Sequence, residues 1–206
     1  MKKSKNYRRV NGFKSMLGDI LFTHKKVLVL VLLCCLFGII VGTATCVGGK
    51  ECLQIENCCD KNLIVFIRGN CSILRFFFCD VIDFAFSLLL IFFLCNIKIL
   101  FPLCFCLLVY KSFCLAFNFC LFVILFGLGG LLFSVIFFLI FGLAMLFLLI
   151  LALHICYDKS RFSCNPKNYY SSCLQSLIVI LIVYIVLTIL KILLLKLISP
   201  IFIIII

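Results

Sequence analysis

Residues 99–156 form a long apolar stretch in which Lys111 is the single residue with a fixed charge. About 20 consecutive apolar residues already span the hydrocarbon core of a bilayer. A soluble helix of comparable length keeps a polar face, and this stretch has too few polar residues to form one. The stretch is therefore predicted to lie in a membrane and to cross it twice, with Lys111 at a position where a charge is costly.

The rest of the chain has the composition of a membrane domain. Hydrophobic residues make up 67% of the 206 residues, against about 45–50% apolar residues in soluble domains. We predict an all-α fold, a polytopic membrane helix bundle of about five transmembrane helices. A basic tail (1–26) precedes a transmembrane domain (27–195), and a short tail (196–206) follows it. The predicted spans are 27–45, 76–95, 99–126, 131–156 and 174–195.

Lys111 leaves two alternatives open for the third predicted span. Either one long tilted helix contains the lysine, or two half-spans meet at the lysine in a re-entrant hairpin. Irregular backbone at membrane depth is tolerated where protein or a water-filled cavity covers it. The number of spans therefore depends on what the chain does at this residue.

Basic residues concentrate at the N-terminus, where residues 1–26 hold eight of the 19 lysines and arginines. A basic tail before an apolar helix is typical of the cytoplasmic side of a membrane, and we expect no nucleic acid partner. With five spans, Lys98 and the net basic segment 157–172 fall on the same side as the N-terminus. The loop 46–62 falls on the other side and contains both basic and acidic residues. We expect a multi-pass cell-membrane protein with an uncleaved signal-anchor, a cytoplasmic N-terminus and an external C-terminus.

The cysteines and histidines do not indicate a chemical centre. Many of the 16 cysteines fall inside apolar runs, where cysteine packs as a small hydrophobic residue. Cys46, Cys52, Cys58 and Cys59 gather in the first loop, where a disulfide can form but its pairing cannot be deduced. Their spacing is not that of a zinc site, His154 stands alone, and no nucleophile, base and oxyanion donor occur together. We expect a non-enzymatic protein without metal or cofactor.

Four polar residues in or near the predicted spans are candidates for an intramembrane site. Asp80 and Asp83 are three residues apart and share a helix face, as do Lys111 and Asn118, which are seven apart. Submerged charges often mark ion or proton pathways, so these residues could line a polar path. The alternative for the acids is a helix that begins after Asp83 and leaves both carboxylates at the headgroups. The alternative for Lys111 and Asn118 is a snorkelling lysine and an amide that hydrogen-bonds between helices.

The order of several motifs resembles the stage II sporulation protein M family, integral membrane proteins of Firmicutes. The first motif is the glycine-spaced run Phe37-Gly38-Ile39-Ile40-Val41-Gly42. After Pro102, the family's aromatic-Lys-Gly-Phe-x-Leu-Gly-Phe motif is matched by Tyr110-Lys111-Ser112-Phe113-Cys114-Leu115-Ala116-Phe117. The turn motif is matched by Phe126-Gly127-Leu128-Gly129-Gly130-Leu131-Leu132-Phe133. Ser112 and Ala116 stand where the family has glycines, and the family's proline near Ile140 is missing.

This resemblance implies a non-enzymatic scaffold of sporulation engulfment. Such a scaffold anchors peptidoglycan-remodelling partners at the lipid bilayer, namely the stage II sporulation proteins D and P. The implied packing or partner-docking residues are Tyr110, Lys111, Ser112, Phe113, Ala116, Phe117, Gly127, Gly130, Gly38 and Gly42. The competing interpretation is a subunit of a membrane transporter or channel, in which Asp80, Asp83, Lys111 and Asn118 line a polar path.

Overall fold

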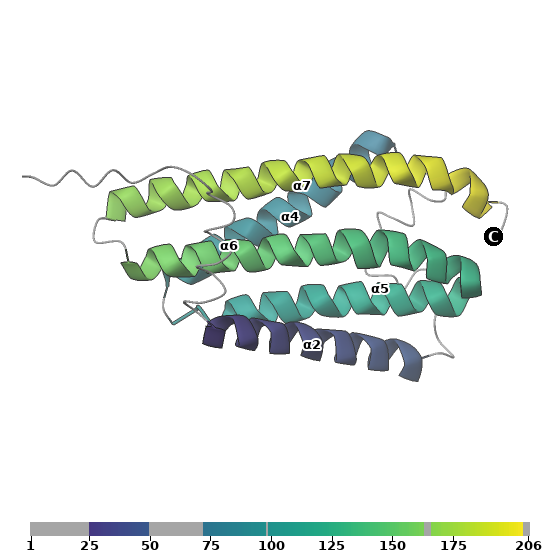
Figure 1. Ribbon diagram of the computed structural model, residues 1–206, viewed down its shortest axis with the longest axis horizontal. Helices are drawn as coiled ribbons and strands as arrows, with labels where there is room; N and C mark the ends of the chain where they lie inside the picture. The colour runs from purple at the N-terminus through teal and green to yellow at the C-terminus, as the bar shows by residue number, and fades with distance from the viewer. Residues whose placement is uncertain (1–24, 50–71, 98, 163–165, 204–206) are drawn as a thin grey trace, which may run out of the picture.

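The computed structural model describes residues 25–49, 72–97, 99–162 and 166–203, and this part of the chain is helical apart from short turns. It contains no strand, which confirms the all-α prediction. The helices follow one another as α2 (Lys25–Gly48), α4 (Ile73–Asn96), α5 (Leu103–Ser134), the π-helix η3 (Val135–Phe141), α6 (Gly142–Phe162) and α7 (Pro166–Ile203). They form an elongated bundle in which α4 crosses the others obliquely (Figure 1).

The described residues contain four stretches long and apolar enough to span a membrane, as a multi-pass membrane protein requires. They are Val29–Gly48, Ile73–Asn96, Leu103–Tyr157 and Tyr170–Leu197. The third is 55 residues long and includes a chain reversal, so the described part of the chain passes along the bundle five times. Large apolar side chains also cover the outer faces of these helices, where they meet lipid in a membrane.

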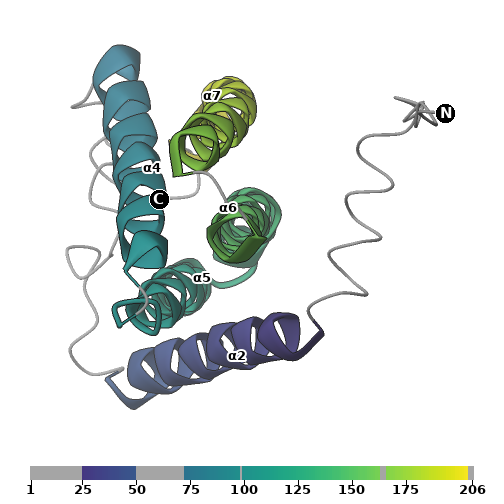
Figure 2. The same cartoon turned by 90° about the vertical axis from the view of Figure 1, so that its left-hand side faces the viewer.

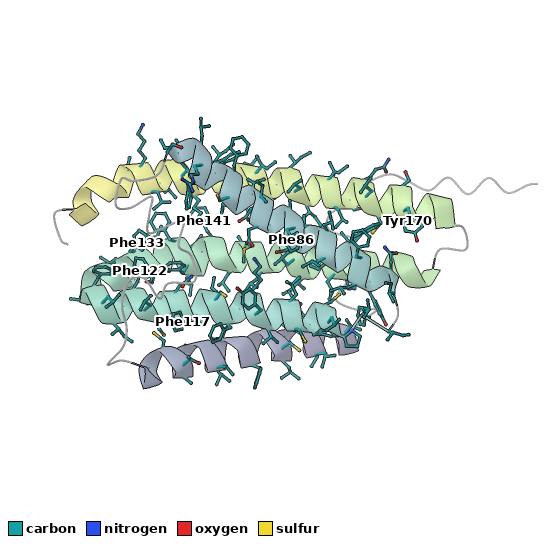
Figure 3. All side chains as sticks on the ribbon, turned by 180° about the vertical axis from the view of Figure 1, so that it is seen from behind. Phe86, Phe117, Phe122, Phe133, Phe141 and Tyr170 are labelled. Atoms are coloured by element: carbon teal, nitrogen blue, oxygen red, sulfur yellow. The ribbon has the colours of Figure 1, made fainter. Side chains whose placement is uncertain are left out.

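The reversal lies at Gly127, between the third and fourth predicted spans. Gly127 has a φ of 57° and a ψ of −131°, a backbone conformation that glycine adopts without steric cost. Beyond the turn the two arms pack together, with the rings of Phe122 and Phe133 stacked 5.2 Å apart between centroids (Figure 3). A Cβ atom on Gly130 would collide with the carbonyl oxygen of Phe122, so this close approach also requires glycine.

Lys111 does not interrupt its helix. The backbone of α5 remains helical from Leu103 past Lys111, and its departure from helical dihedrals comes at Gly127. The alternative of a re-entrant hairpin at Lys111 is therefore wrong. The third span also begins at Leu103 rather than at residue 99, because residues 99–102 form turns and Pro102 caps the helix. Proline is suited to a helix start because it lacks the N–H that an interior position must donate.

The helix α4 begins before both of its acidic residues. Ser72 is the N-cap, and its side-chain oxygen accepts a hydrogen bond of 3.3 Å from the backbone N–H of Arg75. A serine in this role satisfies one of the donors that a helix start leaves without a partner. The alternative in which the helix begins after Asp83 is therefore wrong, and Asp80 and Asp83 both lie within a membrane-length helix.

The helix α2 packs along α5 at the edge of the bundle (Figure 2). A Cβ atom on Gly38 would lie 2.5 Å from the carbonyl oxygen of Val109 and 2.9 Å from the Cβ atom of Ser112. A Cβ atom on Gly42 would lie 2.6 Å from the carbonyl oxygen of Phe113. Small residues thus let the two backbones approach closely, as they do in many membrane helix pairs.

Buried cysteines meet at the end of the bundle where α4 leads into α5 and α6 leads into α7. The Sγ atoms of Cys95 and Cys104 are 3.8 Å apart, and those of Cys156 and Cys173 are 3.3 Å apart. Cys46, predicted to lie in a loop, is buried within α2, which continues to Gly48. The other cysteines of the predicted first-loop cluster (Cys52, Cys58 and Cys59) lie outside the described residues.

The contact between α2 and α5 predicts that Gly42→Ala destabilises the protein. The new methyl group would push against the backbone of α5, and overpacking of this kind costs about 1–3 kcal/mol. Gly48→Ala is the matched control, because a Cβ atom at Gly48 meets nothing within 4 Å. Thermal unfolding in detergent should show a lower Tm for Gly42→Ala than for Gly48→Ala. Equal Tm values for the two variants would contradict this packing.

Candidate functional site

Residues of α4, α5, η3, α6 and α7 line an open cavity of about 270 Å³. All four polar residues selected from the sequence line it, namely Asp80, Asp83, Lys111 and Asn118. The helix α7 adds three polar residues, Tyr184, Thr188 and Lys191. Large apolar side chains make up the apolar wall of the cavity, namely Leu115, Phe137, Phe138, Phe141, Met145 and Leu187. The predicted polar residues therefore converge on one space, although they come from different helices.

Asp80 is held by three donors from one face of α7. Its Oδ2 atom lies 3.1 Å from the hydroxyl of Tyr184 and 3.3 Å from that of Thr188. Its Oδ1 atom accepts a 3.3 Å hydrogen bond from the ammonium of Lys191. The side chains of Asp80 and Lys191 are 17% and 14% exposed, so this ion pair is largely buried. These three donors therefore connect the Asp80 carboxylate to a single helix, α7.

Aromatic rings fix the donors around Asp80. The ring of Tyr184 stacks on that of Phe84 with centroids 3.7 Å apart, which sets the direction of the phenol hydroxyl. The ammonium of Lys191 lies 5.3 Å from the ring centroid of Phe76, within the range of a cation–π interaction. Phe76 and Phe84 are both buried and lie on α4. The aromatic residues of α4 therefore support the polar residues of α7.

Asp83 and Lys111 form the second ion pair of the cavity. The ammonium of Lys111 donates a hydrogen bond of 2.5 Å to the Oδ2 atom of Asp83, which joins α5 to α4. Lys111 is only 11% exposed, whereas Asp83 is 63% exposed. A carboxylate of the neighbouring helix thus neutralises the charge of Lys111.

Sequence analysis missed the contribution of α7. Tyr184, Thr188 and Lys191 recur at i, i+4 and i+7, a spacing that places side chains on one helix face. This polar stripe in an otherwise apolar helix was the available signal. Lys111 and Asn118 are also seven positions apart, and both residues line the cavity. Polar residues at i, i+4 and i+7 in an apolar helix are therefore an informative pattern in this chain.

The other candidate residues lie at the contact between α2 and α5, at the chain reversal or at the cavity. Gly38, Gly42, Ser112, Phe113 and Ala116 bring α2 and α5 together, and Gly127 and Gly130 form the chain reversal. Tyr110 lines the cavity and is exposed, and the ring of Phe117 stacks with that of Phe113. Among the described residues, no three His, Cys, Asp or Glu side chains are placed to hold a metal ion.

Comparison with protein-family models, curated proteins and solved structures gives no match for this chain.

The two carboxylates of the cavity accept different numbers of hydrogen bonds, three at Asp80 and one at Asp83, and this difference predicts different costs of neutralisation. Asp80→Asn removes the carboxylate that pairs with the largely buried Lys191, and breaking a buried pair in this way costs about 3–5 kcal/mol. Asp80→Asn with Lys191→Met should cost less than the sum of the two single changes, because the double variant leaves no unpaired charge. Asp83→Asn should cost less than Asp80→Asn, because Asp83 accepts one hydrogen bond and Asp80 accepts three. The free energy of unfolding in mixed detergent micelles should be measured for the three single variants and the double variant. Additive costs of Asp80→Asn and Lys191→Met would contradict the pairing.

Proposed function

We propose that this chain is a subunit of a membrane transporter or channel, and that the cavity between α4, α5, η3, α6 and α7 is its polar path. The observation that supports this proposal is the convergence of four charged side chains on one space within an apolar bundle. Charges in the membrane interior are costly and are typical of substrate and ion pathways. Within this protein, they form two ion pairs and also line an open space.

The size of that space favours passage or binding over a purely structural role. A volume of about 270 Å³ equals that of about nine water molecules, at about 30 Å³ for each. Buried ion pairs contribute little net stability compared with apolar residues that fill the same volume. A bundle that needed these residues for packing alone would be more stable with the space filled. The open volume beside the charges is therefore the feature that supports solute binding.

Scaffolding is the second candidate function. The resemblance to the stage II sporulation protein M family supports it, and it implies that the chain holds peptidoglycan-remodelling partners at the membrane. Ser112 and Ala116 of the central motif face α2, which leaves them no room for a partner. Tyr110, in contrast, is exposed and accessible. Recovery of peptidoglycan hydrolases by affinity purification in mild detergent would favour this candidate over transport.

Flux through proteoliposomes tests the transport proposal. The wild-type chain should carry at least one probe from a panel of protons, sodium, chloride, sugars, nucleosides and amino acids. Asp80→Asn combined with Lys111→Met should abolish that flux, because one charge is removed from each ion pair of the cavity. Ser176→Ala is the matched control, since its hydroxyl bonds the carbonyl of Ser172 on the exposed side of α7. Absence of flux for every probe with the wild-type chain would overturn the transport proposal.

We also infer that the N-terminus is cytoplasmic and that the C-terminus is external. The basic tail and the basic segment 157–172 support this orientation by the positive-inside rule. Single-cysteine variants test it by labelling with a membrane-impermeant maleimide. A chain that keeps only Cys58 should react on intact cells, and a chain that keeps only Cys164 should react after permeabilisation. The reverse pattern would place the N-terminus outside.

A further inference from the structure

We propose that the ligand of the cavity is a small zwitterion with an apolar side chain, and that the Asp83–Lys111 pair opens to receive its ammonium and carboxylate groups. The chemical class is that of a free amino acid with an aliphatic or aromatic side chain. This inference rests on the proposed function and adds the substrate class. It follows from the balance of charge, the inequality of the two ion pairs and the apolar wall of the cavity.

The charged side chains that line the cavity balance one another. Two carboxylates, Asp80 and Asp83, face two ammonium groups, Lys111 and Lys191. A ligand with a net charge would leave one charge uncompensated in a region of low dielectric constant, which is strongly unfavourable. A zwitterion brings one charge of each sign, so it can enter an opened ion pair and leave every charge with an opposite neighbour.

The two ion pairs are unequal, and only one is suited to opening. Asp80 accepts hydrogen bonds from Tyr184, Thr188 and Lys191, so any exchange there breaks several contacts at once. Asp83 and Lys111 are joined by one hydrogen bond, and Asp83 is largely exposed. Opening the Asp83–Lys111 pair therefore breaks fewer contacts than an exchange at Asp80 would break. The ligand ammonium would then meet Asp83, and the ligand carboxylate would meet Lys111.

Polar groups near the opened pair can complete the contacts of the ligand. Asn118 lies on the same face of α5 as Lys111 and also lines the cavity. Its amide offers both a donor and an acceptor, which suits a ligand that carries groups of both kinds. The amide therefore fits beside either end of a zwitterion, and it adds no charge to the balance of the cavity.

The apolar wall indicates what the rest of the ligand is. Three of its six members, Phe137, Phe138 and Phe141, come from the π-helix η3. Short π-helical segments are frequent at functional sites, and here the segment supplies aromatic side chains to one side of the cavity. Ligand pockets usually measure about 300–1,000 Å³, so a cavity of about 270 Å³ accepts a small molecule. An amino acid with an apolar side chain matches this size and a lining that contains both charged and apolar side chains.

A series of matched ligands tests the substrate class on the wild-type chain in lipid nanodiscs. Phenylalanine and leucine should bind, as measured by calorimetry. Phenethylamine lacks the carboxylate, 3-phenylpropionate lacks the ammonium group and glycine lacks the apolar side chain. Each of these three should bind more weakly by about tenfold or more, because each leaves part of the site without a partner. Equal binding of phenethylamine or 3-phenylpropionate would overturn the zwitterion assignment and identify a cation or an anion site.

Variants then test the Asp83–Lys111 pair as the point of entry. Asp83→Asn and Lys111→Met should each weaken phenylalanine binding by about tenfold or more, and Asp83→Glu should retain more of it because the charge is kept. Ser176→Ala should bind as the wild type does, and thermal unfolding should show that each variant is folded. Full binding by folded Asp83→Asn would overturn the role of this pair.

The outcomes separate this inference from the proposed function. If the wild-type chain carries another probe of the panel and binds neither phenylalanine nor leucine, the substrate class is wrong and the transport proposal stands. If phenylalanine binds and no probe is carried, the site is a zwitterion site and the transport proposal fails.

Discussion

The arrangement of this bundle depends on the cost of placing a charge in a medium of low dielectric constant. Each of the lysines at the cavity is paired with a carboxylate from α4. Asp80 connects α4 to α7, and Asp83 connects the same helix to α5. In hydrocarbon, an ammonium group without such a partner is strongly unfavourable. The oblique helix α4 is therefore the element through which the charges of its two neighbours are neutralised (Figure 1).

A different kind of contact holds the first helix. Apolar attraction between helices is weak in lipid, because the surrounding chains are as apolar as the side chains. The contact between α2 and α5 relies instead on close approach at Gly38 and Gly42. The bundle thus uses backbone proximity on one side of α5 and ion pairing on the other. Ser112 and Lys111 are neighbours in sequence, yet they belong to these two different contacts.

Much of the fold could be predicted from the sequence, because membrane-length apolar segments and a glycine-rich break are direct signals. The turn at Gly127–Gly130 and the position of Lys111 and Asn118 on one helix face both follow from the spacing of these residues in the sequence. The start of α4 was harder to predict, because acidic residues are favoured at helix starts and this left open a helix that begins after Asp83. The partners of Asp80 could not be assigned, since the residues from Tyr184 to Lys191 are more than 100 positions away. Contacts between residues so far apart in the sequence cannot be deduced from spacing alone. A polar stripe in an apolar helix does indicate that the helix has polar partners.

The three-residue spacing of Asp80 and Asp83 has a mechanical consequence. Both carboxylates are carried by one α-helix, whose hydrogen-bonded backbone turns as a unit. A rotation of α4 about its own axis that draws Asp83 away from Lys111 also shifts Asp80 relative to Tyr184 and Lys191. Any event that moves one pair in this way is therefore transmitted to the other, so α4 couples the two ion pairs of the cavity mechanically.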